Sequence, residues 1–189
     1  MKSSKGSAFE REICKELSLW WTNGKSDDVF WRTAGSGARA TTRRKSGKKT
    51  FGQAGDIQAT DPIGQPLIDL CNIELKRGYS KSNLFELVDA PKGRKPCMYE
   101  QFIMQAMEDA EKAGVPYWIL IVKRDRRVPI IIMPYRLLRD LRISSAVINS
   151  IIPFFRIKYR GKSNTSHKLV GMQLSSFLEK VHSSNIKNV

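Results

Sequence analysis

Cysteine and histidine are scarce in this sequence of 189 residues, which contains three cysteines and two histidines. No two cysteines form a Cys-x-x-Cys pair, and His167 and His182 lie far along the chain from all three. This spacing argues against a zinc site. Scattered single thiols suit a reducing cytosol, so we expect a cytoplasmic protein.

Long hydrophobic runs are also missing. The longest, residues 118–122 and 128–133, are far too short to cross a bilayer. The residues before Ser7 lack the apolar stretch of a signal peptide. We therefore expect no membrane association. The hydrophobic content of 41% is nevertheless enough to build a core, and the length suits one domain with a C-terminal extension.

Acidic residues are outnumbered, with 18 Asp and Glu against 33 Lys and Arg, which gives a net charge of +15. Such an excess favours a polyanionic partner, and nucleic acid is the leading candidate. The cations are densest in residues 39–49, where Arg39, Arg43, Arg44, Lys45, Lys48 and Lys49 occur with hardly an apolar side chain. We expect this segment to be a mobile arm that contacts DNA. The alternative is a solubilising loop that points away from the site.

The apolar pattern along the chain alternates between helical and strand periodicity. It predicts helices at residues 7–21, 84–88, 98–113, 135–141 and 175–182. It predicts strands at residues 29–33, 55–60, 67–76, 117–122, 129–133, 154–159 and 167–172. This order indicates an α/β protein with a central mixed β-sheet flanked by helices. We expect residues 1–133 to form the core, in the order α-β-β-β-α-β, and residues 134–189 to form a C-terminal α/β extension packed on it.

The most informative motif is Gly55-Asp56, followed on the next predicted strand by Glu74-Leu75-Lys76. Because side chains alternate along a strand, Glu74 and Lys76 point to the same face. Two carboxylates can hold a hard divalent cation, and a neighbouring lysine can orient or deprotonate the attacking water. The sequence therefore predicts a magnesium site for cutting phosphodiesters. The alternatives are an aspartate that only forms a turn and a charged strand end that emerges into solvent.

The order of these features resembles a family of nucleases. A helix carrying Glu10 is followed by Arg32-Thr-Ala-Gly-Ser-Gly37, by Gly55-Asp56-Ile57 and by Ile73-Glu-Leu-Lys76. In this order the sequence resembles the PD-(D/E)xK nuclease superfamily, and within it the archaeal-type Holliday junction resolvases and their phage-encoded relatives. Ala54-Gly55 stands where the motif has proline. The resemblance implies a restriction-endonuclease-like core, a Mg²⁺ cofactor that Mn²⁺ can replace, and products with a 5′-phosphate.

The resemblance also implies roles for individual residues. Asp56, Glu74 and the Leu75 carbonyl would hold the metal, Glu10 would assist, and Lys76 would position the nucleophilic water. For Glu10 the alternative is a capping box with Ser7 at the start of the helix.

Two further parts of the site follow from the same resemblance. A glutamine from the next helix would lie beside the metal, which makes Gln101 and Gln105 candidates, and the alternative is a solvated helix face with Glu108 and Lys112. The segment with Arg32 and Ser36 would meet DNA phosphates, although a Gly-Ser-Gly sequence is most often an ordinary turn.

The predicted function is a metal-dependent endodeoxyribonuclease that resolves four-way DNA junctions in a bacterial, archaeal or phage-infected cell. Two symmetric cuts require two sites, so we expect a homodimer. Three alternatives stay open: a restriction-like, repair or exonucleolytic enzyme with the same chemistry, a non-catalytic nucleic-acid-binding module, and a basic structural or packaging protein.

Overall fold

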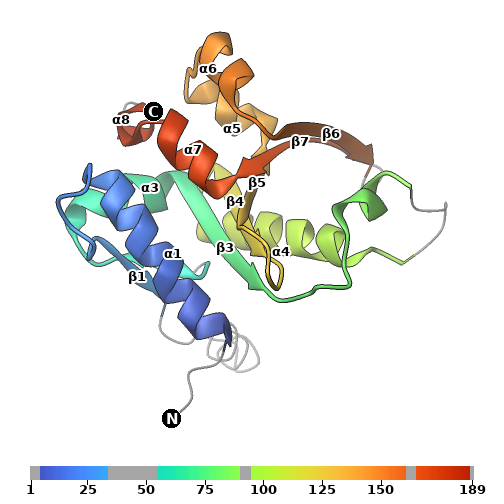
Figure 1. Ribbon diagram of the computed structural model, residues 1–189, viewed down its shortest axis with the longest axis horizontal. Coiled ribbons are helices and arrows are strands. Elements are labelled where there is room, and N and C mark those ends of the chain that lie inside the picture. The colour runs from blue at the N-terminus through green and yellow to red at the C-terminus, as the bar shows by residue number, and fades with distance from the viewer. Residues whose placement is uncertain (1–4, 34–54, 90–94, 161–164, 188–189) are drawn as a thin grey trace.

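The computed structural model describes residues 5–33, 55–89, 95–160 and 165–187 (Figure 1). Its helices are α1 Lys5–Trp21, α3 Gln65–Leu70, α4 Met98–Ala113, α5 Tyr135–Asp140, α6 Ser145–Ser150, α7 Leu174–Lys180 and α8 Ser183–Lys187, with short 3₁₀ helices η1 Pro62–Gly64 and η2 Leu84–Leu87. Its strands are β1 Phe30–Arg32, β2 Ile57–Ala59, β3 Cys71–Arg77, β4 Tyr117–Lys123, β5 Ile130–Pro134, β6 Phe154–Arg160 and β7 Ser166–Gln173.

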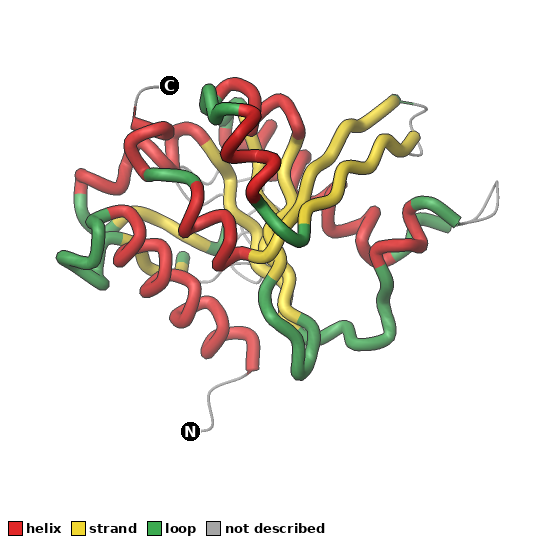
Figure 2. The backbone as a smooth tube through the Cα atoms, turned by 45° about the horizontal axis from the view of Figure 1, so that its top comes forward, coloured by secondary structure: helices red, strands yellow, loops and turns green. Residues whose placement is uncertain are grey.

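The central sheet has five strands in the order β3-β4-β5-β7-β6. Strands β3 and β4 run parallel, whereas every other neighbouring pair is antiparallel, so the sheet is mixed. Strands β1 and β2 form a separate antiparallel pair. Figure 2 shows the central strands lying between helices. The predicted fold class is confirmed: this is a mixed α/β protein with a central sheet flanked by helices, consistent with a restriction-endonuclease-like core.

Helices on the two faces of the sheet bury two hydrophobic clusters, and these fix the orientation of β3. The first cluster joins α1 and α7 to one face and includes Ile73 and Leu75 of β3. The second cluster joins α4 to the other face and includes Ile103 of α4 and Leu120 of β4. Because side chains alternate along a strand, Glu74 is turned towards α4 while its two neighbours pack under α1.

The strand predicted at residues 67–76 is wrong in its first part, because the chain forms helix α3 up to Leu70 and β3 begins at Cys71. Pro66 lies in the first turn of α3, where its missing N–H and fixed φ cost nothing. Leu67 is buried, and Ile68 and Leu70 pack against the first cluster. An apolar run of this kind is compatible with either element, and the proline before it was the signal for the helix.

The remaining differences concern the C-terminal part. Helix α6 was not predicted, although Ser144 was a visible cap: its hydroxyl accepts the Val147 N–H at 3.3 Å. The helix predicted at residues 175–182 is α7, which ends at Lys180 because Val181 takes an extended backbone. Helix α8, which follows it, was not predicted. Strands β6 and β7 continue the central sheet through the pairing of β7 with β5. Across the parts of the chain that the structure describes, no helix has both the length and the apolar character needed to span a bilayer.

Candidate active site

Asp56 lies along the free edge of β3, held there by its own backbone and side chain. Its N–H donates to the Ile73 carbonyl at 2.9 Å, and its Oδ2 accepts the Leu75 N–H at 2.8 Å. The preceding Gly55 has φ +77°, and a Cβ at this position would lie 2.5 Å from Asn72 Oδ1 and 2.8 Å from the Ile73 carbonyl oxygen. Only glycine allows this close approach, so the Gly-Asp pair brings the Asp56 carboxylate to β3.

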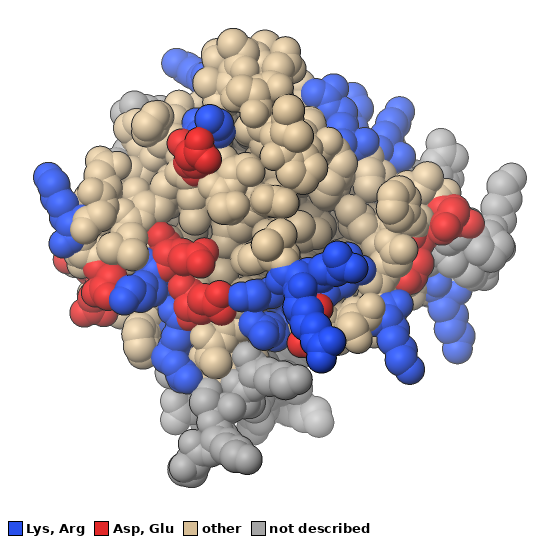
Figure 3. Space-filling view, in the orientation of Figure 1, with Lys and Arg blue, Asp and Glu red and all other residues tan. Residues whose placement is uncertain are grey.

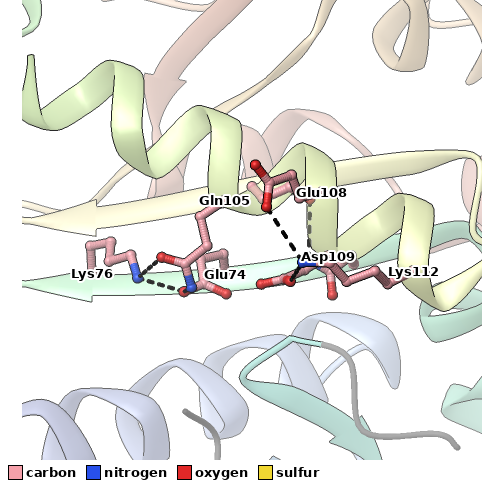
Figure 4. A network of polar contacts seen from close by, with 8 residues as sticks. Glu74, Lys76, Gln105, Glu108, Asp109 and Lys112 are labelled. Atoms are coloured by element: carbon pink, nitrogen blue, oxygen red, sulfur yellow. Dashed lines mark hydrogen bonds and ion pairs between the residues drawn. The ribbon is translucent and has the colours of Figure 1, made fainter. Parts of the chain in front are cut away.

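Glu74, Lys76 and Gln105 form a hydrogen-bonded triangle between β3 and α4 (Figure 4). Lys76 Nζ donates to Glu74 Oε1 at 2.6 Å and to Gln105 Oε1 at 2.9 Å. Gln105 Nε2 donates to the same Glu74 oxygen at 2.8 Å. The Glu74 carboxylate, only 4% exposed, is therefore held in place by one cation and one amide.

The other candidate glutamine, Gln101, is not part of this triangle. It lies one helical turn earlier on α4 and donates from Nε2 to the Pro96 carbonyl at 2.9 Å. On the same helix Lys112 pairs with Glu108 and Asp109, at 3.5 and 3.1 Å. Both glutamines lie on one face of α4, and the position of the helix along β3 brings only the second one to the site.

Glu10 of α1 faces Arg32 at the end of β1. Arg32 Nε lies 3.1 Å from Glu10 Oε2. The contact is an ion pair without hydrogen-bond geometry, because that buried oxygen accepts no hydrogen bond from any residue that the structure describes. Ser7 lies inside α1, beyond the described start of the helix at Lys5, so the capping-box interpretation of Glu10 does not fit.

Burial and the charge of Asp56 raise the pKa of both glutamates of the site. Burial raises the pKa of Glu74 to about 7, and the Asp56 carboxylate adds to this rise while Lys76 opposes it. Burial also raises the pKa of Glu10, where Arg32 opposes the shift and Asp56 again adds to it. The Asp56 carboxylate therefore acts on both glutamates. The three acidic side chains of the site outnumber its two cations, Lys76 and Arg32.

These side chains fit a hard divalent cation. The described residues contain no group of three or more His, Cys, Asp and Glu placed to hold a metal. The available donors are instead the Asp56 and Glu74 carboxylates and the Leu75 carbonyl, with Glu10 nearby, all of them oxygen ligands of the kind that Mg²⁺ and Mn²⁺ take. The raised pKa values and the unsatisfied Glu10 oxygen are the features that an added positive charge would relieve.

Two residues near the site were not singled out from the sequence. Asp109 contributes to the raised pKa of Glu74, and its position one helical turn after Gln105 was the available signal. The ring of Phe102 lies 5.3 Å from Lys76 Nζ, a cation–π contact that depends on tertiary packing. The predicted DNA contacts at Ser36, Arg39, Arg43, Arg44, Lys45, Lys48 and Lys49 lie outside the described residues.

Comparison with known proteins assigns the chain to a family. Residues 1–188 match the family described as "Phage putative PDDEXK endonuclease". Comparisons with curated proteins and with solved structures gave no match. The family match covers nearly the whole chain and confirms two predictions, the PD-(D/E)xK superfamily and its phage branch. It also identifies the chain as an enzyme, a nuclease of the PD-(D/E)xK type. The chain belongs to this family of phage PD-(D/E)xK endonucleases.

Proposed function

We propose that this endonuclease is a divalent-metal-dependent, structure-selective enzyme that cuts four-way DNA junctions and leaves 5′-phosphates. The observation that carries the metal-dependent chemistry is the Glu74–Lys76–Gln105 triangle beside Asp56 on the edge of β3. Selectivity for junctions is supported by the resemblance of the ordered motifs to the archaeal-type resolvases.

Asp56, Glu74 and the Leu75 carbonyl are the residues that would hold the metal, with Glu10 assisting. When bound, a divalent cation polarises the scissile phosphate and stabilises the charge that develops on it. Lys76 uses two of its three N–H donors on Glu74 and Gln105, which leaves one donor within the described structure for a water molecule. Lys76 would therefore orient the attacking water, and Gln105 would keep the lysine in place.

Arg32 is the described residue best placed to meet a DNA phosphate at the site. Its side chain is 31% exposed, and its guanidinium contacts Glu10 without a hydrogen bond to the buried oxygen. A phosphate offers the planar guanidinium a bidentate partner that this contact lacks. Arg32 would therefore bind a substrate phosphate in addition to, or in place of, Glu10.

The test is cleavage of a labelled four-way junction and of a linear duplex of the same sequence, each with Mg²⁺, with Mn²⁺ and with a chelator. We expect metal-dependent cuts placed symmetrically in the junction and much slower cleavage of the duplex. Equal cleavage of both substrates would refute the selectivity for junctions and indicate a PD-(D/E)xK nuclease with another substrate. DNA binding without cleavage in the presence of either metal ion would indicate a non-catalytic DNA-binding module.

Paired cuts also predict a homodimer with two active sites. Analytical ultracentrifugation of the protein, free and bound to a junction, should give twice the chain mass of 21.5 kDa. A single chain bound to each junction would contradict the dimer and favour an enzyme that makes one cut per encounter.

A further inference from the structure

The turn between β4 and β5 is a dense group of cations beside the candidate site. We define the basic hairpin as residues 123–127, Lys123-Arg124-Asp125-Arg126-Arg127. Its last three residues are exposed. Lys and Arg side chains gather over this region on the face shown in Figure 3. The net charge of the hairpin is therefore strongly positive despite Asp125.

The hairpin is anchored at the end of the strand that carries Glu74 and Lys76. Lys123 lies opposite Arg77 in the parallel register of β3 and β4, and its carbonyl accepts the Gly78 N–H at 3.0 Å. The Lys123 ammonium pairs with Glu12 Oε1 at 2.6 Å and lies 5.7 Å from the ring centre of Phe9. Lys123 thus fixes the base of the hairpin to α1, so the arginines that follow have a defined position.

The three arginines of the hairpin have no acidic partner among the residues that the structure describes. Arg124, Arg126 and Arg127 form no ion pair there, not even with Asp125. The remaining residues of the chain hold no Asp or Glu, so they offer these guanidinium groups no acidic side chain. Three cations within four residues of one turn repel one another, and a bound anion would offset that repulsion.

Arg126 also adopts a backbone conformation that arginine does not favour. Its φ is +60°, in the left-handed region where glycine is favoured, so the turn carries strain that a glycine would remove. One other arginine of the described chain shares this feature: Arg142, exposed in the turn after α5, has φ +54°. Because Arg142 shares this conformation, the conformation alone assigns no role to Arg126, and Arg142 serves as a control for the backbone strain.

We propose that the basic hairpin binds the phosphate backbone of the DNA duplex next to the bond that is cut. The inference rests on the proposed function, because it assumes that the scissile phosphate lies at Lys76. Lys76 is paired with Val122, and Val122 is paired with Ile130 after the chain turns back. At about 3.3 Å per residue the arginines therefore lie at most roughly 7 to 13 Å further along, with Arg126 at the tip. With one phosphate per about 3.4 Å of each strand, this corresponds to roughly two to four nucleotides from the cut.

The first experiment measures the salt dependence of affinity for a duplex in chelator, where no cleavage occurs. Replacing all three arginines by glutamine should lower the slope of log affinity against log salt by about 0.9 for each phosphate that is no longer neutralised. An unchanged slope would overturn the inference. The salt slope is read without catalysis, so a wild-type protein that binds DNA but does not cut it would refute the proposed function and leave this result readable. A wild-type protein that does not bind DNA would overturn both.

The second experiment separates the charge of Arg126 from its strain. Arg126→Gly should leave the melting temperature unchanged or raised, yet weaken DNA binding several-fold. Arg142→Gly is the matched control, because it removes an arginine of the same conformation from a turn near α6, far from the hairpin in Figure 1. The control should change stability in the same direction and leave binding unchanged. Equal decreases of affinity in both variants would overturn the inference, because they would show a general effect of net charge.

The third experiment locates the contact on the DNA. Single phosphates are replaced by neutral methylphosphonates at each position on either side of the cut. Replacement at about two to four nucleotides should weaken binding of the wild-type protein and have no effect on the triple glutamine variant. Identical interference patterns for the two proteins would contradict a contact between the hairpin and those phosphates.

Discussion

Gln105 is the residue whose replacement tests the candidate site most directly, because it touches both Glu74 and Lys76 and contributes little to the core. Gln105→Met keeps an unbranched side chain of similar length and removes both hydrogen bonds (Figure 4). Gln101→Met is the matched control: the residue is also exposed, lies one turn away on the same helix, and directs its side-chain amide to the Pro96 carbonyl instead of to the triangle.

The size of the effect follows from the hydrogen bond between Gln105 and Lys76, because this is the bond that positions the lysine. Hydrogen bonds to charged groups contribute about 1.5–3 kcal/mol each, and the exposure of Gln105 places it at the lower end of that range. Removing about 1.4 kcal/mol of transition-state stabilisation lowers the rate tenfold. We therefore expect turnover to fall about tenfold for Gln105→Met, by misplacing Lys76, with DNA affinity unchanged.

The assay is single-turnover cleavage at saturating protein, with the metal concentration varied. Gln105→Met should lower the rate at saturating metal and require more metal to reach it, since groups that orient metal ligands affect metal affinity as well. Gln101→Met should behave as the wild type. A wild-type rate for Gln105→Met, or an equal decrease in the control, would refute the view that the triangle positions the lysine.

Three further predictions follow from the same edge of β3. Asp56→Asn should abolish cleavage but raise stability in chelator, because it removes the charge that opposes ionisation of Glu74; an unchanged or lower melting temperature would contradict this. Gly55→Ala should lower the free energy of unfolding by more than about 1 kcal/mol, while Gly24→Ala, at φ +82° in open space, should cost less, as measured by urea denaturation. In chelator, stability should fall as pH rises from 4.5 to about 7, because Glu74 stays protonated in the folded protein after it ionises in the unfolded chain; Glu74→Gln should remove that part of the slope.

Local sequence signals were sufficient to predict those helices and strands whose own residues determine their conformation. Helix α4 has the bounds predicted from its periodicity, since Gly114 ends it in a left-handed conformation. The strand with Glu74 was predicted for the same reason: its apolar neighbours alternate and pack into a core. The sequence around Leu67 was ambiguous, because an apolar run satisfies both helix and strand, and Pro66 was the local signal that favoured the helix.

Contacts between elements could not be predicted in the same way. The sequence placed Gln101 and Gln105 on one helix face, but the choice between them depends on how far along β3 the helix α4 lies. The pairing of Arg32 with Glu10 likewise needs the end of β1 to lie beside α1. Distances between distant segments follow from the packing of the whole core, and no local pattern encodes them.

The edge of β3 combines several features that lower the folding stability of the protein. A strand with Ile73 and Leu75 in the core also buries the Glu74 carboxylate, which costs free energy unless that group is paired. The chain provides Lys76 and Gln105 for this purpose, but it also uses a glycine with positive φ to bring a second carboxylate, Asp56, to the same edge. An arrangement selected only for stability would lack the second acid. A cation bound between the two carboxylates would offset their repulsion. The arrangement of the site is therefore explained by a bound cation and not by folding stability alone.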